Sequence, residues 1–178
     1  EPVERGRALQ QIVTDLAASL GTASVIILIV MTVVYRSLRI GLITIVPNLF
    51  PLAVTGSMLV IMDWPLNVAS VCSFVVCLGI AVDDTIHFLT RYGYERTEGQ
   101  STPAAIRRAF VHVGTALILT TLILVAGFST VLTSDLAIQR SFAAMACSTI
   151  LAALVGDLIF LPAMLMWWDR EQPGPVDS

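Results

Sequence analysis

The chain has 178 residues, of which 56% are hydrophobic and 13% charged, with a net charge of -3 and a mean hydropathy of +0.85. Because soluble domains carry roughly 25% charged residues, this composition excludes an ordinary water-soluble domain. The ten basic residues are all arginines and form no basic surface of the kind that binds nucleic acid. We expect an integral membrane protein with no nucleic-acid partner.

Five apolar stretches are long enough to cross a bilayer, since a helix needs about 20 residues to span roughly 30 Å of hydrocarbon. None alternates strictly between polar and apolar residues, which argues for helices rather than for barrel strands. The predicted spans are residues 16–35, 40–62, 66–88, 113–133 and 141–168. The predicted fold class is an all-α membrane protein with five transmembrane helices and a short cytoplasmic interfacial helix.

Arginines are unequally shared between the two sides of these spans. Arg5, Arg7 and Arg140 lie on one side. The other seven lie between spans one and two, between spans three and four, or after span five: Arg36, Arg39, Arg91, Arg96, Arg107, Arg108 and Arg170. Positive charge marks the cytoplasmic side. The amino end is therefore expected outside and the carboxyl end in the cytoplasm, in a multi-pass protein of the bacterial inner membrane.

Residues 1–15 are polar and carry no signal peptide. An amino end on the outer side has to be delivered there by something upstream. We therefore expect residues 1–15 to be the tail of an extracytoplasmic region of a longer protein. Residues 16–168 then form the transmembrane domain, and residues 169–178 a cytoplasmic tail.

Residues 91–100 form the one sizeable polar loop that the sequence predicts, and a short helix is expected after it. Thr102 suits the N-cap and Pro103 the first helical position. Arg107 and Arg108 are expected to reach anionic lipid headgroups. The apolar residues of this helix are expected to face lipid: Ala105, Ile106, Ala109 and Phe110. A positively charged topology signal explains the same pattern equally well.

Asp83, Asp84 and His87 stand inside span three, in the string GIAVDDTIHF. A charged residue at mid-bilayer costs about 2.5–3.5 kcal/mol on insertion scales, and a carboxyl group in an apolar environment favours its neutral form. A carboxyl group that gains and loses a proton can couple proton flow to conformational change. Asp83 and Asp84 are therefore the predicted proton relay. His87, one turn from Asp83, is a second relay candidate, or simply an interfacial histidine.

Further polar residues within the spans are candidates for relay or support. Asp157 is a third intramembrane acid, and Thr120 or Thr121 of span four is placed to bond a carboxyl group of span three. A single threonine more often bonds its own helix backbone. The cysteines Cys72, Cys77 and Cys147 are expected to pack as small apolar side chains, with no disulfide and no metal site.

Glycine and proline define two packing features. Gly79, one turn above Asp83, is expected to let another helix approach closely. Pro47 and Pro51 are expected to kink span two, because each removes a backbone donor. A more specific hypothesis is that the two prolines form a hinge for alternating access.

The strings GIAVDDTIHF, YRSLRIGLITIVPNLFP and DLIFLPAML together resemble the second membrane half of resistance-nodulation-division (RND) superfamily transporters. The similarity is to the lipid-exporter branch, which includes MMPL proteins and hopanoid exporters and is related to Patched, and it covers about residues 15–168. The resemblance implies that Asp83 and Asp84 are the acids of the proton-relay helix and that Gly79 is the glycine of its G-x-x-x-D pattern. The multidrug branch has a lysine on the equivalent helix, and this chain has no lysine.

The resemblance further implies a secondary active transporter, not an enzyme, that exports lipidic or hydrophobic molecules. Its energy source is the proton gradient, and no cofactor is expected. Its partners would be the N-terminal half and the extracytoplasmic domains of the same parent protein, together with membrane lipids and, as an open option, further copies of itself.

Three other functions remain open from the residues alone. A non-transporting sterol- or lipid-sensing or scaffolding domain would share the fold without needing protonation. A metal-dependent membrane lipid enzyme would use the D-D-x-x-H string as ligands. An intramembrane aspartyl protease is the least favoured, because its G-x-G-D signature is absent.

Overall fold

The computed structural model describes residues 2–64 and 68–169, and these residues form helices joined by short turns, with no strand among them. Two π-helical turns, η1 (Phe110–Gly114) and η2 (Gly156–Phe160), interrupt the α-helices. The α-helices are α1 (Pro2–Tyr35), α2 (Leu38–Ile61), α3 (Val68–Thr97), α4 (Thr102–Ala109), α5 (Thr115–Val131), α6 (Ala137–Val155) and α7 (Leu161–Asp169).

Four helical segments are long and apolar enough to cross a membrane, and Gly21–Tyr35 is a shorter apolar helix. The four are Leu38–Ile61, Ser70–Thr97, Thr102–Val131 and Ala137–Trp168. The predicted all-α membrane class is therefore confirmed. The predicted start of span three at residue 66 and the tail from residue 170, including Arg170, lie outside the described residues.

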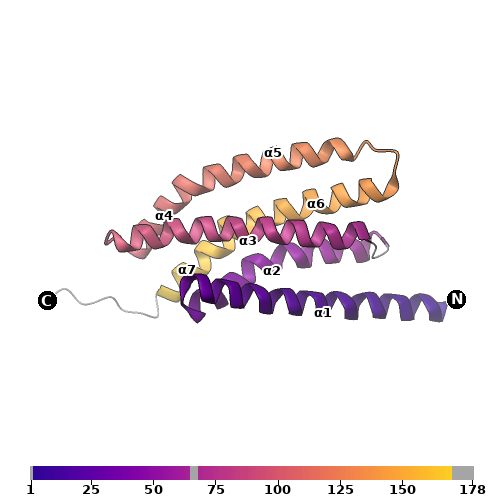
Figure 1. The fold of residues 1–178 in the computed structure, drawn as a ribbon, viewed down its shortest axis with the longest axis horizontal. Helices are drawn as coiled ribbons and strands as arrows, with labels where there is room; N and C mark the ends of the chain where they lie inside the picture. The colour runs from indigo at the N-terminus through magenta and orange to yellow at the C-terminus, as the bar shows by residue number, and fades with distance from the viewer. Residues whose placement is uncertain (1, 65–67, 170–178) are drawn as a thin grey trace.

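The long helices lie side by side along the longest axis of the molecule, with α1 at one edge and α5 at the other (Figure 1). Between them, α6 packs against α2, α3 and α5, whereas α1 packs mainly against α2. Buried alanines on α6, among them Ala143, Ala146 and Ala153, let its neighbours come close. The central position of α6 fixes where its polar residues meet the other helices.

The polar loop predicted for residues 91–100 is wrong in extent, because α3 continues to Thr97. After Thr97 the chain turns at Gly99, whose φ of +78° suits glycine, and the Gln100 nitrogen lies 3.2 Å from the Glu95 carbonyl oxygen. The charged residues that predicted a loop instead pair along the helix: Arg91 donates to Glu95 at 2.5 Å. Polarity here marks the end of the apolar span and not the end of the helix.

The short helix after this turn faces protein rather than lipid, so that expectation is also wrong. It begins at Thr102, with Ser101 rather than Thr102 at the N-cap position. Ala105, Ile106 and Ala109 are buried, and only Phe110 of the four apolar residues is exposed. Ile106 and Ala109 share a core with side chains of α2, α3 and α7: Ile43, Phe88, Leu89, Leu161 and Leu165. Because α4 runs through η1 directly into α5, the bundle sets its direction and not the bilayer surface.

Pro47 and Pro51 are both buried within α2, which remains one continuous helix. Since Pro51 has no N–H, the carbonyl group of Pro47 loses its donor four residues on. Gly156 of η2 lies against that carbonyl group: a Cβ atom there would stand 2.6 Å from the Pro47 oxygen. The proline-interrupted part of α2 and the π-turn of η2 therefore touch backbone to backbone.

We predict that Gly156→Ala destabilises the fold by about 1–3 kcal/mol, because the added methyl group overlaps the Pro47 carbonyl group. Unfolding of the full-length protein by SDS titration in mixed micelles measures the effect. Gly127→Ala on α5 is the matched control, since a Cβ at Gly127 meets nothing within 4 Å. Equal stability of the two variants would contradict the close contact.

Candidate functional site

A groove of about 480 Å³ runs between α3 and the segment formed by η1 and α5. Since α6 packs against both α3 and α5, it holds the two walls of the groove in place. The groove is lined by Ile80, Asp83, Asp84, His87, His112, Val113, Ala116, Leu117, Thr120 and Leu124. Both aspartates and the histidine predicted as relay residues thus open on a single groove.

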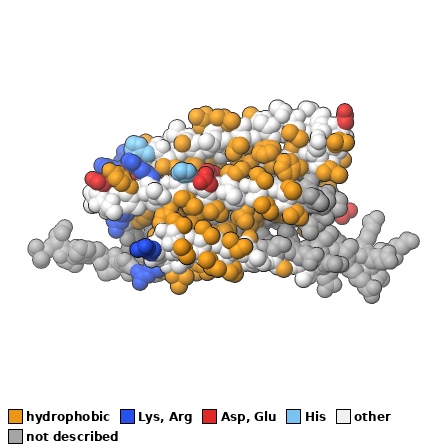
Figure 2. All heavy atoms as spheres, in the orientation of Figure 1, with side chains coloured by type: hydrophobic (Ala, Val, Ile, Leu, Met, Phe, Trp, Pro, Cys, Tyr) orange, Lys and Arg blue, Asp and Glu red, His pale blue; other side chains and the backbone are white. Residues whose placement is uncertain are grey.

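Asp83 and His87 interact within the groove, one helical turn apart. His87 Nε2 lies 3.6 Å from Asp83 Oδ1, and both side chains are about two-thirds exposed in this chain, at 66% and 68%. Asp84 is half-buried and interacts electrostatically with Asp83 and His87. Figure 2 shows acidic side chains beside a histidine on this face, in a field of hydrophobic side chains, with arginines gathered near one end of the molecule. Ionisable groups therefore occupy an otherwise apolar stretch of α3.

The groove also contains a histidine that the sequence analysis missed. His112 stands on η1 and lines the same groove as His87. It lies between the predicted surface helix and the predicted span four, which begins at residue 113. The signal lay in the spacing: His112 precedes the groove residue Ala116 by one helical turn, and both precede Thr120 on the same face.

The two threonines of α5 have different surroundings. Thr120 lines the groove, and its hydroxyl group donates to carbonyl oxygens of its own helix, at 3.1 Å to Ala116 and 3.0 Å to Leu117. Thr121 is buried, with 2% of its surface exposed. The hydrogen bonds of Thr120 are thus those of a threonine that satisfies its own backbone.

The face of α3 that carries Asp83 continues as an open surface. Gly79, Val76 and Cys72 are exposed on it, respectively one, two and three turns from Asp83. A Cβ atom at Gly79 would meet nothing within 4 Å. The close helix contact predicted at Gly79 is therefore not made by the described part of this chain.

Asp157 lies away from the solvent, with 1% of its surface exposed, on η2. The hydroxyl group of Thr85 on α3 lies 2.6 Å from Asp157 Oδ1, and Asn48 Nδ2 on α2 donates to the same hydroxyl oxygen at 3.1 Å. Asp157 is a candidate predicted from the sequence, whereas Thr85 and Asn48 are not. Two signals existed: Thr85 directly follows Asp84, and Asn48 stands between Pro47 and Pro51.

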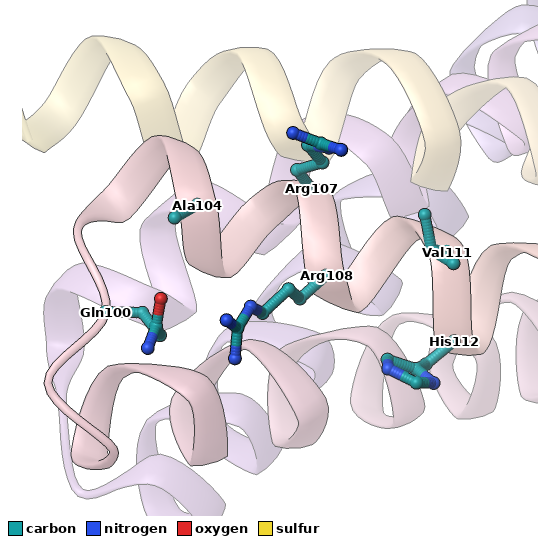
Figure 3. A pocket seen from close by; sticks show the side chains of 6 residues that line it. All are labelled: Gln100, Ala104, Arg107, Arg108, Val111 and His112. Carbon is teal, nitrogen blue, oxygen red and sulfur yellow. The ribbon is translucent and has the colours of Figure 1, made fainter.

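Arg107 and Arg108 separate at the end of the bundle that bears most arginines, beside a pocket of about 400 Å³. Figure 3 shows Arg108 on the side of Gln100 and His112, and Arg107 projecting the opposite way. Arg108 donates to Glu95 at 3.3 Å, and Arg91 donates to the other oxygen of this buried carboxylate. Arg108, one of the two arginines predicted to reach lipid headgroups, thus instead links α4 to α3 through Glu95.

The three cysteines are free thiols, with Cys77 buried, Cys147 half-buried and Cys72 exposed. None of them lines the groove. They take no part in the arrangement of ionisable groups described above.

Bilayer-length apolar helices, with carboxyl groups and imidazoles between them, define a multi-pass membrane protein that has ionisable groups inside its membrane domain. The model of the MMPL family matches residues 9–175, and the chain belongs to this family. The chain is 29% identical over 145 residues to MJ1562 of Methanocaldococcus jannaschii, whose name describes it only as a membrane protein. The match covers 82% of this chain and 37% of MJ1562, so this chain spans little more than a third of that relative.

We predict that Arg108→Gln lowers the free energy of unfolding by about 1 kcal/mol, because it removes one of two charged donors from the buried Glu95 carboxylate. The estimate is at the low end for a charged hydrogen bond, since the Arg108 side chain is 54% exposed. SDS titration of the full-length protein measures the change. The neighbouring variant Arg107→Gln is the control, and a loss of stability as large as that of Arg108→Gln would refute the assignment.

Proposed function

We propose that this chain is the membrane-embedded, proton-translocating part of a proton-coupled exporter of lipidic or hydrophobic molecules. The observation that carries the proposal is the groove between α3 and α5, where Asp83, Asp84 and His87 meet in the middle of an apolar bundle. Membership of the MMPL family, with its transporters, supports the same function. Ionisable groups at this depth are costly and are a mark of ion pathways.

In the proposed cycle, Asp83 and Asp84 bind and release the transported proton. Adjacent carboxylates repel each other, so one proton shared between the two positions lowers the energy of the pair. His87, 3.6 Å from Asp83, exchanges a proton with it. His112 and Thr120 line the same groove and are proposed to support the relay, and the buried Thr121 supports the position of α5.

The exposed face of α3 supports a second part of the proposal, which concerns partners. A helix face with Gly79 and Asp83 uncovered, in a chain that spans about a third of a relative's length, fits a surface that the N-terminal half of the same protein covers. Alternating access in many transporters works between two repeated halves. Extracytoplasmic domains and membrane lipids complete the proposed set of partners, and an assembly of several copies stays open.

The proposed location is the bacterial inner membrane, with the arginine-rich ends of α1, α3 and α4 in the cytoplasm. Arg36 lies at the end of α1, and Arg91 and Arg96 lie in the last turns of α3. In this orientation the groove acids lie within α3 at some distance from both membrane surfaces. Pro47 and Pro51 are proposed as a hinge of the cycle.

The alternative of a metal-dependent lipid enzyme has little support in the geometry. Within residues 2–64 and 68–169, no three histidine, cysteine or acidic side chains are grouped so that they could hold a metal ion. A sterol- or lipid-sensing domain remains the second candidate, because it would share this fold. A sensing domain would not depend on titration of the groove acids. Substituting these acids therefore distinguishes an exporter from a sensing domain.

We predict that Asp83→Asn or Asp84→Asn reduces pH-gradient-driven export at least about a hundredfold, because an amide group cannot carry the proton. The assay uses the full-length protein in liposomes with an imposed pH gradient. The probe is a fluorescent lysophospholipid, and a trapped pH indicator follows proton entry in the same vesicles. His87→Gln is expected to reduce the rate by a smaller factor, about tenfold.

Asp135→Asn is the matched control, since Asp135 is an exposed acid in the turn between α5 and α6. Its export rate should equal that of the unsubstituted protein at matched expression. Undiminished export by both Asp83→Asn and Asp84→Asn would overturn the relay and favour a sensing role.

A further inference from the structure

A second carboxyl site lies outside the groove, enclosed where α2, α3 and η2 meet. Asn48, Thr85 and Asp157 form a continuous hydrogen-bonded cluster, and each has 1% or less of its surface exposed. None of the three lines the groove. The cluster therefore places a carboxyl group inside the protein, on the far side of α3 from the exposed Asp83 face.

The hydroxyl group of Thr85 has more neighbours than it has hydrogens. Its oxygen accepts a hydrogen from Asn48 Nδ2, and its single hydrogen can go either to Asp157 Oδ1, at 2.6 Å, or to the carbonyl oxygen of Ala81, at 3.0 Å. An ionised Asp157 is acceptor-only, so Thr85 must donate to it. A protonated Asp157 can donate to the Thr85 oxygen, which frees the Thr85 hydrogen for Ala81. The same heavy atoms therefore satisfy Asp157 with or without a proton.

We propose that Asp157 is a second proton-binding site and that Thr85 is a positioning residue. When Asp157 gains or loses a proton, the Thr85 hydroxyl group changes its hydrogen bonding on α3. The inference deepens the proposed function and rests on it, because the proton reaches Asp157 from the groove acid Asp84. In this step the O–H bond of Asp84 breaks, a new O–H bond forms on the Asp157 carboxylate, and Asp84 is left ionised. The hydrogen of Thr85 then turns from Asp157 to Ala81.

The charges around Asp157 favour such an exchange. Asp84 directly precedes Thr85, the residue that bonds Asp157, and a single proton held on either of the two carboxylates lowers their mutual repulsion. The partners in the cluster, Asn48 from α2 and Thr85 from α3, are uncharged. From the other side, η1 meets η2 where Gly114 lies against Leu158, which is also uncharged. Asp84 is thus the proposed source of the proton that Asp157 binds.

The backbone around the cluster is irregular in a way that lets protonation change its shape. Asp157 lies in a π-turn, and π-turns inside α-helices are frequent at functional sites. A threonine that bonds the carbonyl group four residues back tends to bend its helix. Protonation of Asp157 strengthens this bond from Thr85 to Ala81. The expected consequence is a change in the bend of α3 beside the groove acids.

Infrared difference spectroscopy of the full-length protein in liposomes, recorded across a pH titration, tests the site directly. A band from the protonated carboxyl group of Asp157 should be present in the unsubstituted protein and lost in Asp157→Asn. Thr85→Val keeps the size of the side chain but removes the hydroxyl group, so the band should shift in wavenumber. Thr85→Ser, which keeps the hydroxyl group, should leave the band in place.

Thr55→Val is the matched control for loss of a buried hydroxyl group, since Thr55 is fully enclosed on α2 and bonds Pro51 and Thr149 instead. Its spectrum should equal that of the unsubstituted protein. A titrating band that survives Asp157→Asn, or one that Thr85→Val leaves unshifted, would overturn the inference.

Transport distinguishes this inference from the proposed function. Thr85→Val should lower pH-gradient-driven export of the lysophospholipid probe at least about tenfold while the Asp157 band still titrates, and Thr85→Ser should restore export. Full export by Thr85→Val would refute the coupling role of Thr85 even if Asp83→Asn abolishes export. The spectra need no export, so failure of the exporter function leaves the test of Asp157 as a proton site intact.

Discussion

Every polar group inside this bundle has to find its hydrogen-bond partner within the protein, because the hydrocarbon core of a bilayer offers none. Most hydroxyl groups meet this requirement locally: Thr44 bonds Gly41, and Thr55 bonds Pro51, each on its own helix. Asn48 bonds the Thr44 carbonyl oxygen on its own helix and also reaches Thr85 on α3, and Asp157 finds its hydroxyl partner on another helix. Their common partner, Thr85, is what brings α2, α3 and η2 into one register.

The same constraint separates the intramembrane acids into two kinds. Asp157 is enclosed and has a hydroxyl partner, so its environment is set by protein alone. Asp83 and Asp84 open on a groove, where their surroundings depend on what fills the space between α3 and α5. An open acid exchanges protons readily, and an enclosed acid holds one in a defined geometry. The proposed relay uses both properties, and the two kinds of acid lie on opposite sides of one helix.

The sequence predicted the helices well, because composition and length are enough to locate them, and it drew attention to the acids, whose role stays a prediction. Apolar runs of about 20 residues are sufficient to locate spans, and GIAVDDTIHF stands out within such a run. Partners across helices were harder to predict, since the place of Thr85 after Asp84 and of Asn48 between two prolines does not say which residues they face until α2, α3 and η2 are placed in space. The two errors at residues 91–110, the loop and the lipid-facing helix, have one origin. Charge at residues 91–100 predicted a loop, yet Arg91, Glu95 and Arg108 use their charges to join α3 to α4.

Irregular backbone occurs in three described parts of the bundle, and all three lie around the acids. Pro47 and Pro51 interrupt the hydrogen bonds of α2, η2 lies against Pro47 through Gly156, and η1 lies against η2 where Gly114 meets Leu158. Each irregularity leaves backbone groups less well bonded than in a regular helix, a cost that a membrane protein tolerates only where protein covers the defect. Helices also rearrange most easily where their hydrogen bonds are already interrupted. The three sites are contiguous, with Asp157 on η2 and the groove acids one helix away. In the proposed cycle this contiguity gives a change in protonation a short physical route to a change in helix packing.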